Sequence, residues 1–183
     1  MQNDRYALLV IDMQLVAFDG KITPPIVHGS QVLDSTAELI DISRANGIPV
    51  VYLQTCALSG MPYAKDVHGW EIHPRLSPAA ADRVVYKVQS NGFEDTELQE
   101  VLTQIGVDAL ITCGIWSEYC VTATSKAALE LGYRVCVATD AHGTVADSED
   151  NAREIVTRQN NELVQCGALS LDVKSIATEL IGT

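Results

Sequence analysis

The chain has 183 residues, and its 12 Lys and Arg against 24 Asp and Glu give a formal net charge of −12. Hydrophobic residues make up 47% of the chain and charged residues 20%, a globular composition that excludes a mainly disordered chain. Such an acidic surface repels phosphate backbones and anionic lipid, so we expect neither nucleic acid nor membrane as a partner. About 150 residues make one domain, so we expect a single domain over residues 1–183.

The N-terminal residues and the cysteines bear on the cellular compartment. No basic stretch leads into an apolar segment at the start of the chain, so we expect no signal peptide and a cytoplasmic protein. The five cysteines are odd in number and form no CxxC pair. We therefore expect free thiols, with neither a disulfide framework nor a zinc knuckle.

Strands and helices alternate along the first part of the chain. The continuous apolar run at residues 6–12 predicts a central parallel strand that is buried on both faces. Helical spacing of apolar residues predicts a helix over 32–46 that ends at Gly47, and a second strand follows at 48–54. The stretch 55–82 is rich in Gly and Pro and predicts a long, functional loop.

The alternation continues to the end of the chain. Strands are predicted at 83–87, 107–113, 133–138 and 168–171, and helices at 95–105, 119–131, 148–162 and 173–180. Strands joined by helices imply right-handed crossovers. We therefore expect an α/β fold with a six-stranded, mostly parallel sheet and helices on both faces.

Polar residues at the carboxyl ends of these strands are the candidate site, because open parallel sheets bind ligands there. Asp12 ends the first strand, Lys87 the third and Thr139-Asp140 the fifth. Cys120 follows the fourth strand near a helix start, which together with a nearby cation favours a thiolate nucleophile. Asp12 could carry the proton of that thiol, and Lys87 could stabilise the thiolate.

Each of these residues also has a purely structural interpretation. A cysteine near a helix start commonly packs, an aspartate after a strand commonly caps a turn, and a lysine at a strand end is commonly solvated. Cys113 and Cys136 lie within apolar strands and are expected in the core. Cys56, just past the second strand, is the rival nucleophile.

Several segments, in chain order, resemble the isochorismatase-like cysteine hydrolases. They are VIDMQ at 10–14, K at 87 with SNGF at 90–93 and TEL at 96–98, GIWSEYCV at 114–121, the stretch 127–133, and DA at 140–141. This family includes nicotinamidases, N-carbamoylsarcosine amidase, ureidoacrylate and biuret amidohydrolases, and isochorismatase. The resemblance implies a three-layer α/β/α sandwich and, because family members are commonly oligomers, a homo-oligomer.

The resemblance also implies roles for individual residues. Cys120 is then the nucleophile, Asp12 the general base and Lys87 the third member of a catalytic triad. The backbone amides of Trp116 and Cys120 form an oxyanion hole, and the Ile115–Trp116 peptide corresponds to one that is often cis in the family. Phe18, Trp116 and Tyr119 would wall the substrate pocket; the alternative for these residues is ordinary aromatic packing, and for Tyr119 the two interpretations have about equal weight.

A metal site is the point at which this chain departs from the nicotinamidases. Their Asp-Trp-His segment after the second strand binds a metal, and the corresponding QTCAL at 54–58 has no such residues. We therefore expect no metal and no other cofactor. His68 and His73, near Asp66 and Glu71, keep a metal site open as an alternative, with a spacing that fits no zinc motif.

The expected function is a cysteine-dependent amidohydrolase. It would cleave a C–N bond of a small amide, carbamoyl or imide substrate through an acyl-enzyme on Cys120. The alternatives are an isochorismatase-type or nicotinamidase-type hydrolase, a non-catalytic binding protein on the same fold, and a redox-responsive thiol protein.

Overall fold

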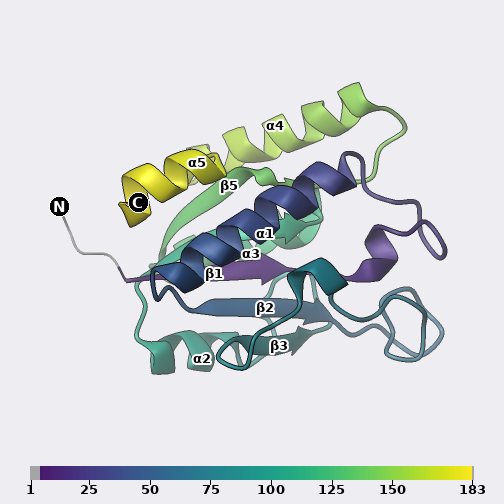
Figure 1. The fold of residues 1–183 in the computed structure, drawn as a ribbon, viewed down its shortest axis with the longest axis horizontal. Helices are drawn as coiled ribbons and strands as arrows, with labels where there is room; N and C mark the ends of the chain where they lie inside the picture. Colours follow the sequence, from purple (N-terminus) through teal and green to yellow (C-terminus); the bar gives the residue numbers. More distant parts are fainter. Residues whose placement is uncertain (1–4, 183) are drawn as a thin grey trace.

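The computed structural model describes residues 5–182 (Figure 1). The strands are β1 (Tyr6–Ile11), β2 (Val50–Thr55), β3 (Arg83–Lys87), β4 (Ala109–Ile115), β5 (Arg134–Gly143) and β6 (Leu169–Leu171). The helices are α1 (Gly29–Ala45), α2 (Leu98–Ile105), α3 (Thr122–Glu130), α4 (Glu149–Gln165) and α5 (Val173–Ser175). Single turns are η1 (Leu15–Ala17), η2 (Pro74–Leu76), η3 (Ser117–Val121) and η4 (Ile176–Ile181).

All six strands form one sheet in the order β3-β2-β1-β4-β5-β6, and every pair is parallel. Helices cover both of its faces, so the molecule has three layers, α/β/α, as expected. On one face α1, α5 and η4 pack against residues such as Leu8, Val10 and Ile111. On the other face α2, α3 and α4 pack against residues such as Leu9, Val51 and Leu110. The alternation of these strand residues between the two clusters follows from the two-residue period of a strand.

The sheet reverses its strand order between β1 and β4. From β1 the chain steps outward to β2 and β3, and then crosses over to β4 on the other side of β1. At such a switch point the connections leave in opposite directions and open a crevice beyond the strand ends. In Figure 1 the arrowheads of β1 and β2 point toward the long loop that follows β2.

Gly114 allows β1 and β4 to approach closely at this edge. It pairs with Ile11 and has φ +121°. A Cβ atom there would lie 2.0 Å from the carbonyl oxygen of Ile11, so no other residue fits without moving the backbone. The close approach brings the residue after β1 beside the turn after β4.

Several predicted boundaries were wrong near the carboxyl edge. β2 extends to Thr55, β4 to Ile115 and β5 to Gly143. Thr139 and Asp140 therefore lie within β5, and the Asp140 carboxylate accepts a hydrogen bond from the backbone N–H of Val173 at 3.0 Å. This correction makes Asp140 an anchor for α5.

The segment 56–82 is irregular apart from η2, as its Gly and Pro content predicted. Gln14, which is fully buried, ties it to the sheet: its amide donates to the carbonyl of Thr55 at 3.1 Å and to that of Trp70 at 2.7 Å. The Trp70 indole N–H also donates to the carbonyl of Thr55 at 3.0 Å. Within residues 5–182 we find no helix long and apolar enough to cross a membrane.

Candidate active site

Four neighbouring strands each bring a polar side chain to the switch point. Lys87 ends β3, Thr55 ends β2, Asp12 follows β1, and Cys120 lies in the turn after β4. Lys87 and Thr55 are partners in the sheet register, and β1 lies between β2 and β4. The parallel sheet therefore collects in one place residues that are up to 108 positions apart in sequence, since 120 − 12 = 108.

Asp12 and Lys87 form a buried ion pair. The Lys87 ammonium lies 2.7 Å from Asp12 Oδ2, and both side chains are almost completely shielded from solvent. Thr55 bridges the pair, because its hydroxyl donates to Asp12 Oδ1 at 3.0 Å and accepts from Lys87 Nζ at 3.0 Å. Such contacts are needed because an unpaired charge at this depth is strongly unfavourable.

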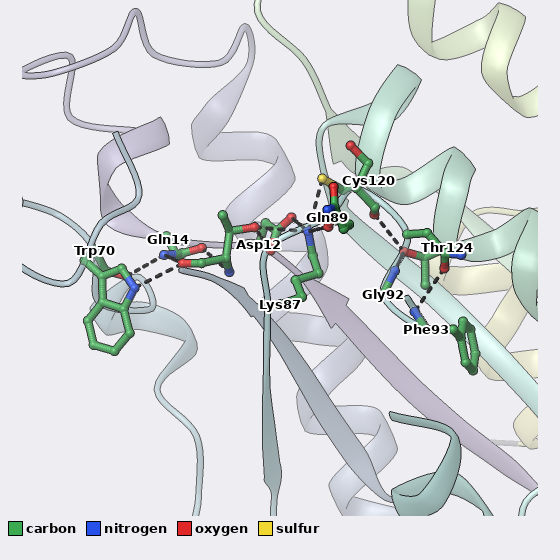
Figure 2. A network of polar contacts seen from close by, with 12 residues as sticks. Asp12, Gln14, Trp70, Lys87, Gln89, Gly92, Phe93, Cys120 and Thr124 are labelled. Carbon is green, nitrogen blue, oxygen red and sulfur yellow. Dashed lines mark hydrogen bonds and ion pairs between the residues drawn. The ribbon is translucent and has the colours of Figure 1, made fainter. Parts of the chain in front are cut away.

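Lys87 also reaches the cysteine (Figure 2). Its ammonium donates to Cys120 Sγ at 3.3 Å and to the carbonyl oxygen of Gln89 at 3.1 Å. The loop that carries Gln89 is in turn held to α3, because the Gly92 N–H donates to the Thr124 hydroxyl at 2.9 Å. Lys87 is thus fixed between the carboxylate and the sulfur.

Asp12 adopts a backbone conformation that is unusual for a residue with a side chain. Its φ is +53°, in the left-handed region. Hydrogen bonds hold it on both sides: its N–H donates to the Leu53 carbonyl at 2.9 Å, and its carbonyl accepts from the Gln14 N–H at 2.7 Å. Strain of this kind concentrates at functional sites.

The electrostatics correct one expectation from the sequence. Burial and, to a smaller extent, the Asp12 carboxylate raise the pKa of the Cys120 thiol to about 12, because Lys87 opposes them only in part. Burial lowers the pKa of Lys87, but Asp12 and Cys120 together raise it above its ordinary value. In the free protein the cysteine is therefore a neutral thiol beside a charged lysine, because desolvation outweighs the cation and the helix start.

The turn that carries the cysteine is η3, a π-helical turn that leads into α3. The Trp116 carbonyl accepts from the backbone N–H of Tyr119 at 3.1 Å and of Val121 at 3.2 Å. The Ile115–Trp116 peptide is cis, which agrees with the expectation from the resemblance. Trp116 and Cys120 thus lie at the N-terminal end of a helix, where backbone N–H groups lack acceptors within the helix.

Three polar side chains linked by hydrogen bonds hold the first residue of η3 in place. The Ser117 hydroxyl and His142 Nδ1 lie 2.9 Å apart, and His142 Nε2 lies 2.9 Å from Asn160 Oδ1. The amide oxygen can only accept, so His142 Nε2 carries the proton and Ser117 donates to Nδ1. Burial lowers the pKa of His142 to about 4, so this histidine is neutral at physiological pH. β5 and α4 thereby fix the first residue of η3.

The catalytic candidates line one cavity of about 170 Å³. Its lining residues are Asp12, Thr55, Tyr63, Lys87, Val88, Gln89, Ser90, Trp116 and Cys120. Phe18 and Tyr119 do not belong to this lining among the described residues. Phe18 packs edge-on against His73, with ring centroids 5.3 Å apart, and Tyr119 is largely exposed beside Cys120.

The two loop histidines do not come together as metal ligands. His68 Nε2 pairs with Asp19 Oδ2 at 2.5 Å, and His73 Nδ1 accepts from the backbone N–H of Arg75 at 3.3 Å. Within residues 5–182, no group of three or more His, Cys, Asp or Glu side chains is arranged to hold a metal ion. Neither Cys113 nor Cys136 contributes to the cavity; both are buried in the sheet, as predicted.

Three parts of the site were not predicted from the sequence. Thr55 directly follows the second predicted strand, so its position at the carboxyl edge was a usable signal. Gln89 acts through its backbone carbonyl, which no side-chain pattern reveals. Tyr63 comes from the irregular loop, and its placement depends on tertiary contacts.

Comparisons with known proteins place the chain in a family. The isochorismatase domain profile matches residues 6–168, which is most of the chain. The chain therefore belongs to the isochorismatase family of hydrolases, and its six-stranded parallel sheet matches the fold of isochorismatase-like structures.

Individual relatives give a closer view. The chain is 41% identical over 138 residues to a streptothricin hydrolase of Streptomyces noursei, an alignment that covers 75% of this chain and 49% of that protein. It thus spans about half the length of the streptothricin hydrolases of Streptomyces noursei that it matches. Solved structures include an isochorismatase family protein from Desulfovibrio vulgaris, with TM-score 0.84, 25% identity, and 97% and 98% of the two chains covered. N-carbamoylsarcosine amidase from Thermoplasma acidophilum has TM-score 0.76, 26% identity, and 92% and 96% covered.

Proposed function

We propose that this protein is a cysteine-dependent amidohydrolase that cleaves a C–N bond of a small amide, carbamoyl or imide substrate. The observation that carries the proposal is the contact of one buried ammonium, Lys87 Nζ, with both Asp12 Oδ2 at 2.7 Å and Cys120 Sγ at 3.3 Å. A nucleophile, a proton carrier and a cation then meet at one cavity. Relatives named streptothricin hydrolase and N-carbamoylsarcosine amidase support hydrolysis of this kind.

In the first half-reaction Cys120 Sγ attacks the carbonyl carbon while the thiol proton passes to Asp12. A thiol with a pKa of about 12 holds little thiolate at neutral pH, so it needs a base in contact with it during attack. The carbonyl oxygen gains the negative charge and receives hydrogen bonds from the backbone N–H groups of Trp116 and Cys120.

The C–N bond then breaks, and Asp12 returns the proton to the leaving nitrogen. Ammonia or an amine departs, and the acyl group remains on sulfur as a thioester. Water next attacks the thioester, Asp12 takes its proton, and the C–S bond breaks to release the acid. Reprotonation of sulfur by Asp12 restores the starting state.

Lys87 stays charged through this cycle. Its raised pKa keeps the proton on the ammonium, and its fixed contacts hold Asp12 facing the sulfur. As negative charge moves between carboxylate and sulfur, the cation stabilises both forms. Thr55 keeps the carboxylate in one orientation, because it accepts from Lys87 while donating to Asp12.

Ammonia release over a panel of small amides, ureas and imides tests the proposal. The panel is run with the wild type, Cys120→Ala and Cys56→Ala. We expect turnover of at least one compound by the wild type and by Cys56→Ala, with at least a 10³-fold loss in Cys120→Ala. Near-wild-type turnover by Cys120→Ala together with loss in Cys56→Ala would show that the wrong thiol has been assigned.

A further inference from the structure

The cavity beside Cys120 contains one buried hydroxyl that the mechanism does not use. Two lining residues in the described part of the chain have buried side-chain oxygens without a hydrogen bond, namely Asp12 Oδ2 and the Tyr63 hydroxyl. Asp12 Oδ2 is paired with Lys87, whereas the Tyr63 hydroxyl, which interacts with the Trp116 side chain, donates its own proton to no group in the described part of the chain. A buried hydroxyl whose proton has no acceptor is costly, and in a binding cavity an ordered water or a ligand supplies that acceptor.

The structure fixes this hydroxyl in place. The Tyr63 side chain packs against the core cluster that α1 covers, and its backbone holds a positive φ of +69°. The Tyr63 carbonyl accepts from the Ala57 N–H at 3.1 Å, and the next residue, Ala64, is completely buried. A group held in this way loses little conformational entropy when a ligand binds.

The groups around the Tyr63 hydroxyl favour its protonated form, which can donate a hydrogen bond. Burial raises the pKa of Tyr63 and the charge of Asp12 raises it further, while a hydrogen bond that the hydroxyl oxygen accepts from the Trp116 side chain opposes both to a smaller extent. The hydroxyl therefore stays protonated and can donate a hydrogen bond. Two other polar groups of the lining are already engaged, since the Lys87 ammonium has four partners and the Thr55 hydroxyl has two.

We propose that Tyr63 is a specificity residue whose hydroxyl donates to a second carbonyl of the substrate, beyond the one that Cys120 attacks. The substrate class is thereby narrowed to compact dicarbonyl nitrogen compounds: diamides, acylureas and imides. The volume of the cavity suits substrates of this size, because about 170 Å³ is close to the roughly 150 Å³ that holds one benzene molecule. The inference rests on the proposed function, because it takes the same cavity as the substrate site.

The test is a binding cycle that needs no turnover. Malonamide and 3-methylbutanamide have the same number of non-hydrogen atoms and nearly the same shape, and only malonamide carries the second carbonyl. Their dissociation constants are measured by calorimetry or ligand-observed NMR in the Cys120→Ala background, with and without Tyr63→Phe. Tyr133→Phe in the same background is the matched control, because the Tyr133 hydroxyl lies outside the cavity and accepts from Gln99.

We expect malonamide to bind about 10-fold more tightly than 3-methylbutanamide, and Tyr63→Phe to remove this preference while Tyr133→Phe keeps it. Because Tyr63→Phe keeps the aromatic ring and removes only the hydroxyl, the variant should bind 3-methylbutanamide as tightly as the parent does. A preference that survives Tyr63→Phe, equal binding of both amides by the parent, or binding of neither would overturn the inference. The Cys120 mechanism has a separate readout in ammonia release, so each idea can fail without the other.

Discussion

At the scale of single residues, the protonation of Cys120 is set by competition between burial and charge. The sequence predicted a thiolate, on the strength of a helix start and a nearby lysine. The structure has both features, yet the sulfur is buried and adjoins a carboxylate, which together raise its pKa to about 12. The catalytic power of this thiol therefore depends on Asp12 acting during attack, as a base in direct contact, and not on a standing pool of thiolate.

Asp12→Asn separates these two effects of the carboxylate. Loss of the proton carrier should reduce kcat by about 10²-fold or more. Loss of its negative charge should lower the thiol pKa, so iodoacetamide should alkylate Cys120 faster in the variant than in the wild type at pH 8. Peptide mass mapping of the labelled cysteine measures the rate, with circular dichroism to verify folding. Slower alkylation in the variant across the pH range would mean that Asp12 does not raise the thiol pKa.

At the scale of elements, the sequence predicted every strand and helix but not the details of the carboxyl edge. Apolar runs and helical spacing are local signals, so β1 and α4 could be recognised without tertiary information. The extension of β5 to Gly143 could not, because Asp140 and His142 look like polar loop residues. From the sequence, His142 resembles a surface residue. Its partners Ser117 and Asn160 come from η3 and α4, so they are identified only once the chain is folded.

His142 should make the protein less stable in acid. Its pKa of about 4 in the folded state lies below the ordinary value of 6.5, so the unfolded chain binds more protons between these two pH values. The contribution of neutral His142 to the free energy of unfolding is complete above pH 6.5. It is lost as the pH falls toward 4, and it amounts to on the order of 3 kcal/mol in total. Urea unfolding at several pH values should show a smaller loss of unfolding free energy for His142→Gln than for the wild type. If the unfolding free energy fell equally with decreasing pH in the two proteins, His142 would not be a buried, neutral histidine.

At the scale of the whole molecule, the site exists because β1 and β4 flank a switch point: β2 and β3 are added on one side of β1, and β4 to β6 on the other. The triad candidates were found from sequence because each one ends or follows a recognisable strand. The walls of the cavity were not, because Tyr63 lies in a loop whose path depends on anchors such as Gln14 and Trp70. Phe18 and Tyr119, chosen by resemblance, lie outside the lining that the structure describes.

The arrangement of the histidines bears on metal dependence. His68 is paired with Asp19, and His73 packs against Phe18, so neither joins a ligand cluster within the described residues. Activity on the best amide of the panel should therefore be unchanged after prolonged dialysis against EDTA. A loss of activity that is restored by one equivalent of zinc or iron per chain would revive a metal-assisted reaction.

In the proposed mechanism Cys120 carries the acyl group during turnover. The most direct measurement is rapid acid quenching of the enzyme during turnover of its best substrate, followed by peptide mass mapping. We expect the acyl mass on the peptide that contains Cys120, and neither this adduct nor ammonia release in Cys120→Ala. An acyl mass on Cys56 or any other residue, or ammonia release by Cys120→Ala at a near-wild-type rate, would contradict this mechanism.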